Sequence, residues 1–306
     1  MNAGALSSIA DIAGLPSRHG DSHATVGGAM REAFGALAQA GIETARLDAR
    51  VLLGHAIGCD WAALLVRHDG VMPLRQVEIF KSLIARRVRR EPVAHIVGRR
   101  EFWSLDFHVS AATLIPRPDS ETVVEAVVEI NRDRHGELKI LDLGTGSGCL
   151  LLSLLHEYPN ARGIGVDISM PALSVAAANS RSLGVEDRAA FIAGNWDAAL
   201  DACFDVIVVN PPYVRDEDFD KLSPEVSVFE PREALSGGHD GLDCYRSLVG
   251  GLARLLTADG AAFLETGAGQ AASVAGLVNR NDLYVIDIKR DLSRIERCVV
   301  AGRGGR

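Results

Sequence analysis

The C-terminal two thirds of the chain alternates between short apolar strands and amphipathic helices, and this alternation constrains the fold most. Strand patterns occur at Lys139–Leu143, Gly163–Asp167, Ala190–Ala193, Asp205–Val209, Ala261–Glu265, Tyr284–Ile288 and Arg297–Val300. Helical patterns lie between most of them, at Gly148–Glu157, Pro171–Ser182, Gly241–Leu256 and Gln270–Val278. Such alternation predicts an α/β fold with an open, seven-stranded, mostly parallel sheet covered on both faces.

The last two strand patterns are joined only by the short segment Lys289–Glu296. Parallel neighbours need a long crossover, whereas antiparallel neighbours do not. We therefore expect these two strands to pair antiparallel.

The rest of the chain divides into segments that differ in their hydrophobic pattern. Residues 1–25 lack periodicity and are expected to form a flexible tail. Residues 26–91 predict a small helical bundle, with a stop at Gly41, a cap at Thr44 and a third helix carrying the apolar stripe Leu74–Val88. Residues 92–118 predict a linker with a β-hairpin, and 119–306 form the α/β domain.

Composition excludes several classes of protein. The net charge of −8 argues against a protein that holds long nucleic acid by its phosphates. Five scattered cysteines without a C-x-x-C pair argue against a disulfide framework or zinc site and favour a reducing cytosol. No apolar run is long enough to span a bilayer. The basic run Arg86–Arg90 is interpreted as a solvated helix end or, alternatively, as a docking patch for an acidic partner.

A glycine-rich run, Asp142-Leu-Gly144-Thr145-Gly146-Ser147-Gly148, lies where the first parallel strand turns into its helix. Glycines let the backbone approach a ligand closely, and the helix start offers free N–H groups. The G-x-G-x-G spacing differs from the dinucleotide fingerprint, because Cys149 stands where its third glycine would fall. Asp142 would repel a pyrophosphate but attract a cationic sulfonium with an ammonium group.

Asp167 ends the second parallel strand, where a carboxylate can accept hydrogen bonds from both ribose hydroxyls. Taken alone, Asp167 could equally cap the helix ahead of Pro171. Together with the glycine run, it resembles the cofactor site of the seven-stranded S-adenosylmethionine-dependent methyltransferases. In that resemblance the loop Gly194–Asp197 flanks the adenine, so Trp196 is either a stacking partner or a partly buried structural residue.

The tetrapeptide Asn210-Pro211-Pro212-Tyr213 follows the fourth strand and is the sharpest chemical signal. Its prolines stiffen the loop and remove two backbone donors. The oxygens of Asn210 and Pro211 suit the two hydrogens of a planar NH₂ group, and the ring of Tyr213 suits its face. Such a grip would aim the nitrogen at a methyl carbon for in-line displacement. Asn-Pro-Pro is also a good structural turn, but beside a methyl-donor pocket we interpret it as catalytic.

Several longer stretches resemble the release factor glutamine methyltransferase family. They are Glu91–Gly98, Glu101–Phe107, Leu114–Thr122, Glu230–Gly238 and Gly241–Arg246. The resemblance spans roughly residues 28 to 302, so it does not depend on one motif. It departs at Ser120, where threonine is usual, and at Ser293–Arg294, where a small residue and glycine are usual.

The resemblance implies a Rossmann-like methyltransferase domain, a substrate-recognition role for the helical domain, and S-adenosyl-L-methionine as cofactor. The implied substrate is the glutamine of the Gly-Gly-Gln motif in class 1 peptide chain release factors. Cofactor contacts are expected from Asp142, Gly144, Thr145, Gly146, Ser147, Gly148, Asp167, Trp196 and Asn210. Substrate contacts are expected from Asn210, Pro211, Pro212 and Tyr213, with Arg117 and Glu121 near the mouth. We expect a cytoplasmic monomer with no metal, no membrane attachment and no stable nucleic-acid partner.

Three alternatives remain. A sister enzyme would methylate glutamine in a ribosomal protein, although the stretch Arg117–Glu121 favours the release-factor branch. An adenine N6-methyltransferase shares the catalytic loop but would need a basic groove for nucleic acid. A scaffold that has lost activity is disfavoured, because the glycine run, Asp167 and the Asn210–Tyr213 loop are intact.

Overall fold

The computed structural model describes residues 25–59, 62–63, 68–198 and 200–303, which fall into two compact units, Met1–Val97 and Gly98–Arg306. Most of the predicted N-terminal tail lies outside the described residues. Its last residue, Thr25, belongs to the helical unit instead: its hydroxyl accepts a hydrogen bond from the backbone N–H of Gly28 and caps the first helix. The division after Val97 assigns the predicted hairpin to the C-terminal unit rather than to a separate linker.

The described part of the N-terminal unit is helical, and its helices pack on one apolar core. They are α2 (Val26–Gln39), α3 (Ala45–Ile57), α5 (Leu74–Val88) and α6 (Val93–Val97). The chain turns after α2 at Gly41, which has a φ of 69°. Thr44 stands at the N-cap of α3 as predicted, but its hydroxyl donates to Asp48 instead of capping the helix.

Within the basic run Arg86–Arg90, neither a solvated helix end nor a docking patch describes Arg87. Arg87 is buried, and its Nε lies 2.7 Å from a carboxylate oxygen of Asp48 on α3. Its neighbour Arg86 pairs with Glu91 through two nitrogens. A buried charge is tolerated only when it is paired, and the pair of Arg87 with Asp48 joins α5 to α3.

The C-terminal unit is built on a seven-stranded sheet with the strand order β5-β4-β3-β6-β7-β9-β8. Its strands are β3 (Lys139–Leu143), β4 (Arg162–Asp167), β5 (Ala189–Ala193), β6 (Phe204–Val209), β7 (Leu256–Glu265), β8 (Leu283–Arg290) and β9 (Glu296–Arg303). The pairs from β5 through β7 are parallel, whereas β9 pairs antiparallel with both β7 and β8. The predicted mostly parallel sheet and its antiparallel last pair are confirmed.

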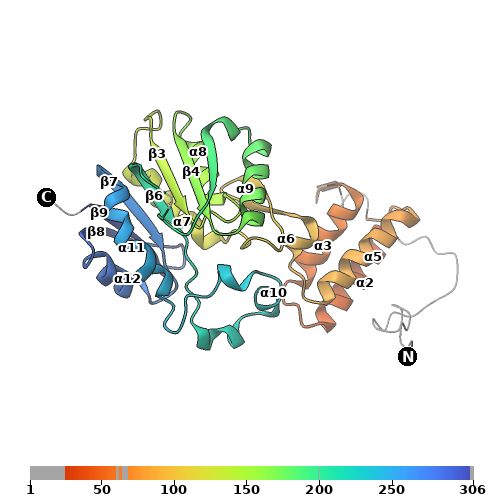
Figure 1. The fold of residues 1–306 in the computed structure, drawn as a ribbon. Helices are drawn as coiled ribbons and strands as arrows, with labels where there is room; N and C mark the ends of the chain where they lie inside the picture. The colour runs from red at the N-terminus through yellow and green to blue at the C-terminus, as the bar shows by residue number, and fades with distance from the viewer. Residues whose placement is uncertain (1–24, 60–61, 64–67, 199, 304–306) are drawn as a thin grey trace, which may run out of the picture. The chain divides into compact units, whose positions relative to one another are not determined.

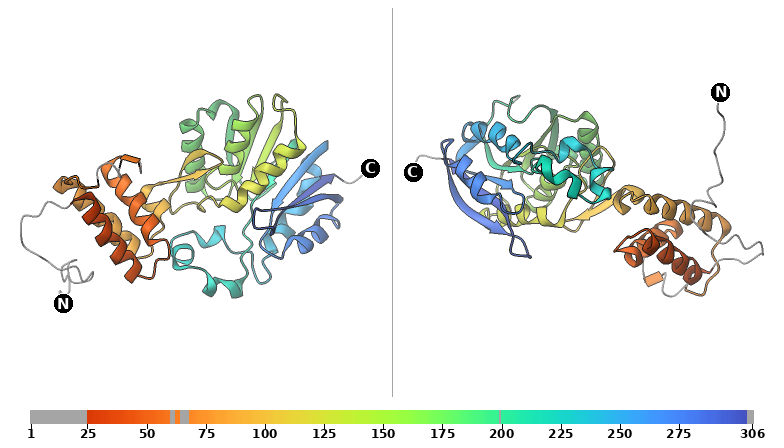
Figure 2. Two further views of the ribbon diagram at one scale, coloured as in Figure 1. Left: turned by 180° about the vertical axis from the view of Figure 1, so that it is seen from behind. Right: turned by 90° about the horizontal axis from the view of Figure 1, so that it is seen from below.

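Helices cover both faces of this sheet, as Figure 2 shows. One face carries α7 (Glu121–Ile130), α8 (Cys149–Glu157) and α9 (Met170–Ser182), and the other carries α11 (Asp243–Leu255) and α12 (Ala271–Val278). The central strands β3 and β6 are buried along almost their whole length and are apolar apart from Lys139, Asp142 and Asp205, because both of their faces are covered. The loop from β6 to α11 holds the short helix α10 (Pro224–Ser227).

Sequence patterns placed most elements within a few residues, and the differences have local causes. Helix α8 starts at Cys149 rather than Gly148, because Gly148 has a φ of 82° and is the left-handed N-cap. Leu256 begins β7 instead of ending α11. Helix α7 was not predicted as an element, since its run of valines also suits a strand.

The predicted hairpin is present as the antiparallel pair β1 (Arg99–Phe102) and β2 (Leu105–His108). A buried side chain, Asn179 of α9, holds β2 of this hairpin against the rest of the unit. Its carboxamide accepts from the backbone N–H of His108 at 2.7 Å and donates to that residue's carbonyl at 3.0 Å. It also donates to the carbonyl of Ser147 in the glycine-rich run at 2.9 Å.

No helix within the described ranges is both long and apolar enough to cross a bilayer.

Candidate functional site

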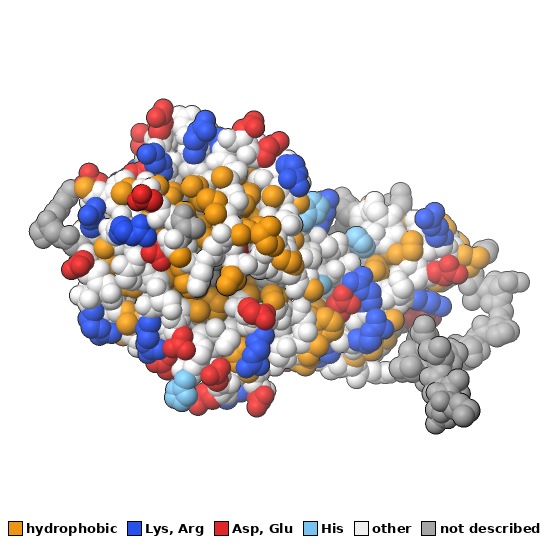
Figure 3. Space-filling model, viewed as in Figure 1, with side chains coloured by type: hydrophobic (Ala, Val, Ile, Leu, Met, Phe, Trp, Pro, Cys, Tyr) orange, Lys and Arg blue, Asp and Glu red, His pale blue; other side chains and the backbone are white. Residues whose placement is uncertain are grey.

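A cavity of about 390 Å³ opens at the carboxyl ends of β3, β4 and β6, where parallel sheets place their ligand sites. Figure 3 shows apolar side chains gathered around a hollow on this face of the C-terminal unit, with charged side chains mostly toward its rim. The predicted site residues that line the cavity are Asp142, Gly144, Thr145, Gly146, Ser147, Asp167, Trp196, Asn210, Pro212 and Arg117.

The glycine-rich run forms one wall of this cavity. Gly144 and Gly146 have φ values of 76° and 55°, in the left-handed region that favours glycine. A Cβ at Gly144 would lie 3.3 Å from the indole of Trp196, so a larger residue there would crowd the ring. Trp196 thus lies next to the glycine-rich run, and its expected contact with the adenine stays a prediction. Gly148 lies just outside the lining, where it shapes the start of α8.

The carboxylate of Asp167 links the glycine-rich run after β3 to the start of α9. One carboxylate oxygen accepts from the backbone N–H of Gly146 and the other from that of Ser169, both at 2.9 Å. The helix cap considered for Asp167 belongs to Ser169, whose hydroxyl accepts from the N–H of Ala172. Each carboxylate oxygen has a second acceptor site, so Asp167 can still bind two hydroxyl groups.

Asp142 is a buried carboxyl group at the floor of the cavity. One oxygen accepts from the hydroxyl of Thr145 at 2.7 Å, but Oδ1 has no hydrogen-bond partner among the described residues. Burial raises the pKa of Asp142 to about 7, and the charge of Asp167 adds to this effect, while the Thr145 hydrogen bond opposes it. A buried acceptor without a partner is costly unless a ligand satisfies it, so this oxygen fits a cationic or donor group.

The Asn210–Tyr213 loop forms the opposite wall. Asn210 and Pro212 line the cavity, and the side-chain nitrogen of Asn210 donates to the hydroxyl of Ser120 at 3.3 Å. This leaves the side-chain oxygen of Asn210 as the available acceptor. Pro211 is buried, and neither it nor Tyr213 is among the lining residues. Burial raises the pKa of Tyr213, so its phenol stays neutral.

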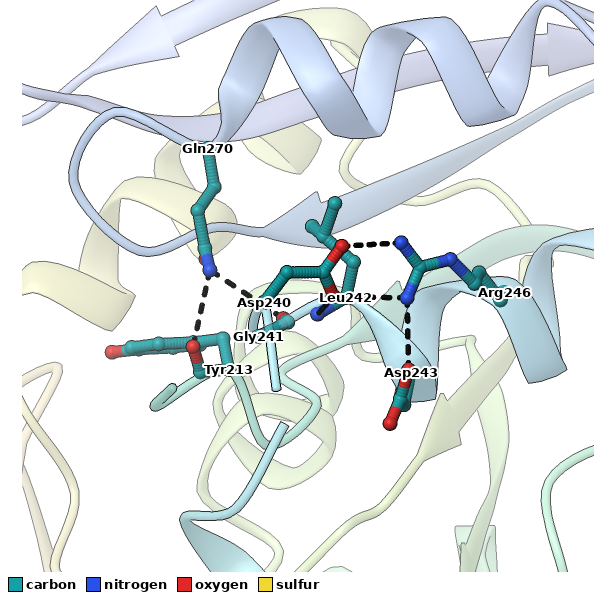
Figure 4. Close-up of polar contacts among 7 residues, drawn as sticks. All are labelled: Tyr213, Asp240, Gly241, Leu242, Asp243, Arg246 and Gln270. Carbon is teal, nitrogen blue, oxygen red and sulfur yellow. Dashed lines mark hydrogen bonds and ion pairs between the residues drawn. The ribbon is translucent and has the colours of Figure 1, made fainter. Parts of the chain in front are cut away.

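A buried glutamine that the sequence did not single out holds this loop from behind, as Figure 4 shows. The side-chain nitrogen of Gln270 donates to the carbonyls of Tyr213 at 3.1 Å and Gly241 at 3.4 Å, and its oxygen accepts from Gly267. Next to it, Arg246 bridges Asp240 and Asp243 at the start of α11. The loop is thus fixed by partners distant in sequence.

The two charged residues expected at the mouth of the site differ in position. Arg117 lines the cavity and forms an ion pair with buried Glu230, which also accepts from the backbone N–H of Ile115 at 3.0 Å. Glu121 is not a lining residue, and its carboxylate accepts from the backbone N–H of Trp103 at 2.9 Å. Glu121 therefore supports the hairpin rather than the mouth of the cavity.

Comparison with known proteins assigns the chain to a family. Its residues 28–98 match the PrmC N-terminal domain, and residues 134–284 match a methyltransferase domain. The release factor glutamine methyltransferase of Rhodospirillum rubrum is 45% identical over 290 residues, which cover 95% of this chain and 89% of the relative. The chain belongs to the release factor glutamine methyltransferase family.

Other members of the release factor glutamine methyltransferase family are similarly close. That of Bradyrhizobium diazoefficiens is 44% identical over 277 residues, covering 89% of this chain and 93% of the relative. A solved protein-(glutamine-N5) methyltransferase (release factor-specific) from Alicyclobacillus acidocaldarius is 26% identical, with a TM-score of 0.39, over 65% of this chain and 100% of the other. As a member of this family, the chain is a methyltransferase.

Proposed function

We propose that this chain transfers a methyl group from S-adenosyl-L-methionine to the side-chain amide nitrogen of the glutamine in the Gly-Gly-Gln motif of class 1 peptide chain release factors. The single observation that carries the proposal is the position of Asn210. Its oxygen is the free acceptor at the wall of a cavity whose other wall is a glycine-lined, acidic ligand site. The relatives from Rhodospirillum rubrum and Bradyrhizobium diazoefficiens are release factor glutamine methyltransferases by name, which supports a glutamine of a release factor as the acceptor.

The glycine-lined half of the cavity suits S-adenosyl-L-methionine. The carboxylate of Asp167 would bind the ribose hydroxyls, Trp196 would lie against the adenine, and the unpartnered oxygen of Asp142 would face the cationic part of the cofactor. Thr145, Ser147 and the three glycines would shape the backbone around it. Bound in this way, the cofactor supplies an electrophilic methyl group beside Asn210.

The chain's own residues would position the amide. The oxygen of Asn210 and the backbone oxygen of Pro211 would accept the two N–H hydrogens, and the neutral ring of Tyr213 would pack near its plane. The amide nitrogen would take the methyl group that the bound cofactor supplies, the sulfur would keep the electron pair of its broken bond to carbon, and the proton that the nitrogen releases would pass to water. Because an amide nitrogen is a weak nucleophile, positioning and polarisation supply most of the acceleration.

The buried carboxyl of Asp142 predicts a pH dependence of cofactor affinity. Its pKa of about 7 in the free protein means that a growing fraction is protonated as the pH falls below 7. A bound cation favours the ionised form, so binding must release this proton, and affinity should fall by up to about tenfold per pH unit below 7. Calorimetric titration with the cofactor from about pH 5.5 to 8.5 measures this slope.

The matched variant for this titration is Asp142→Asn, which keeps the size of the side chain and the acceptor for Thr145 but cannot ionise. Its affinity should be lower than that of the wild type at pH 8 and nearly independent of pH. A flat profile for the wild type would contradict the proposed contact between Asp142 and the cationic cofactor.

The direct test of the proposed function is incubation of the purified chain with methyl-labelled cofactor and a purified class 1 release factor. Label should enter the wild-type factor and not a variant whose Gly-Gly-Gln glutamine is alanine. Ribosomal proteins and adenine-containing nucleic acid serve as competing acceptors, and preferential labelling of either would overturn the proposal. A substrate that acts in translation would place the enzyme in the cytoplasm, and we propose that it acts there as a monomer without a stable nucleic-acid partner.

A further inference from the structure

The side chain of Asn210 has two chemically different ends of nearly the same shape. If its NH₂ end faced the cavity, it would lie against the NH₂ group of a bound glutamine, and two donors cannot form a hydrogen bond with each other. If its oxygen faces the cavity, it accepts one of the hydrogens. The orientation of this one carboxamide therefore decides whether the proposed substrate can be gripped, and something outside the loop must select it.

Ser120 is placed to make that selection. It ends the short 3-10 helix Pro118–Ser120, is buried, and lines the cavity next to Asn210. Its hydroxyl oxygen lies 3.3 Å from the side-chain nitrogen of Asn210, and its own backbone N–H donates to the carbonyl of Arg117 at 3.1 Å. An acceptor at this point attracts the NH₂ end of Asn210 and turns the oxygen toward the cavity.

A serine hydroxyl can accept or donate, so it needs a partner that fixes its direction. Glu265, at the end of β7, is buried, and the Ser120 hydroxyl interacts with its carboxyl group and lowers the pKa of that group. The Oε2 of Glu265 has no hydrogen-bond partner within the described ranges. When Glu265 is ionised, its carboxylate can only accept from the hydroxyl, which leaves the lone pairs of Ser120 for the N–H of Asn210.

Charged and titratable groups surround Glu265 on several elements. Burial raises the pKa of Glu265 to about 7, and Asp119 adds to this effect, whereas the Ser120 hydroxyl and the cations Arg297 and Arg117 oppose it. The other groups that feel its charge are Tyr213, Tyr245, Cys149 and Cys298. The cations offset only part of the cost of burial, so the carboxylate form predominates only above about pH 7.

We propose that Glu265 and Ser120 are positioning residues that orient the Asn210 carboxamide with its oxygen toward the substrate, through the chain Glu265–Ser120–Asn210. This inference rests on the proposed function, because it is the amide of the substrate that requires an acceptor. Neither residue contacts the reacting atoms. Both act by selecting one of two orientations of the group that does.

The experiment compares turnover and cofactor affinity in Ser120→Ala, Ser120→Thr and Glu265→Gln. Loss of one hydrogen bond should lower kcat by about three- to tenfold in Ser120→Ala, with cofactor affinity unchanged within about twofold. Ser120→Thr keeps the hydroxyl and should recover most of the turnover. The matched control is Ser153→Ala, since Ser153 on α8 is also a buried hydroxyl, lies outside the cavity lining and should leave kcat unchanged.

Glu265→Gln tests the whole path from Glu265 through Ser120 to Asn210, and not the contact between Ser120 and Asn210 alone. It should lower kcat, whereas adding it to Ser120→Ala should cause no further loss, because the path to Asn210 is already broken. The proposal would be overturned if the decreases in kcat of the two single variants multiplied in the double variant. It would also be overturned if kcat were unchanged in Ser120→Ala. Wild-type transfer to the release factor is measured first: its absence overturns the proposed function itself, which separates the two failures.

Discussion

Replacing Asn210 by alanine should lower turnover on a release factor by about 30- to 1,000-fold, equivalent to a loss of about 2–4 kcal/mol of transition-state stabilisation. The substitution removes the free acceptor at the cavity wall and leaves the hydroxyl of Ser120 without its donor. Cofactor affinity should change much less, because Asp142, Asp167 and the glycine run are untouched. Single-turnover kinetics with saturating cofactor measures the effect.

Asn210→Asp is the matched variant for this experiment. It keeps an acceptor oxygen and the size of the side chain but removes the NH₂ group that Ser120 holds. Near-normal turnover in Asn210→Ala would mean that the loop acts through its prolines and tyrosine alone. The role assigned to Asn210 would then be wrong.

Replacing Asp167 by alanine should weaken cofactor binding by about 2–4 kcal/mol, through the loss of hydrogen bonds from a charged acceptor to the ribose. The same change removes the acceptor for the backbone N–H of Gly146, so the glycine turn also loses a constraint. Titration calorimetry measures the dissociation constant directly. Turnover at saturating cofactor should be far less affected than affinity.

Asp167→Asn provides the comparison, since it retains one oxygen without the charge and should fall between the wild type and alanine. An affinity in Asp167→Ala that is within about twofold of the wild type would contradict the ribose contact. It would also imply that the carboxylate serves only to join Gly146 and Ser169.

Much of the fold could be predicted because its patterns are local. The apolar strands β3 and β6 and the spacing of Gly144, Gly146 and Gly148 are visible in a single sequence. The antiparallel pairing of β8 and β9 also followed from the length of one loop. These features depend on residues that are close together in the chain.

The supporting residues of the site could not be found in this way. Ser120 meets Asn210 across 90 positions, and Gln270 meets Tyr213 across 57. The sequence assigned no individual role to Glu230, which was named only within a family-like stretch, or to Glu265, and only folding shows that both side chains are buried. Glu121 shows the same limit: although it is close to Arg117 in sequence, its carboxylate accepts from the backbone N–H of Trp103, while Arg117 lines the cavity.

The three hydrogen bonds of Asn179 have a consequence for protein engineering. The same carboxamide that fastens β2 through His108 also fastens the carbonyl of Ser147, so the hairpin and the ligand-binding turn share one anchor point. Because both contacts to the hairpin are to backbone atoms of residue 108, a hairpin grafted from a relative keeps this anchor only if its backbone follows the same path. We expect a chimera that displaces this backbone to hold the carbonyl of Ser147 less tightly, although every side chain that lines the cavity had been kept.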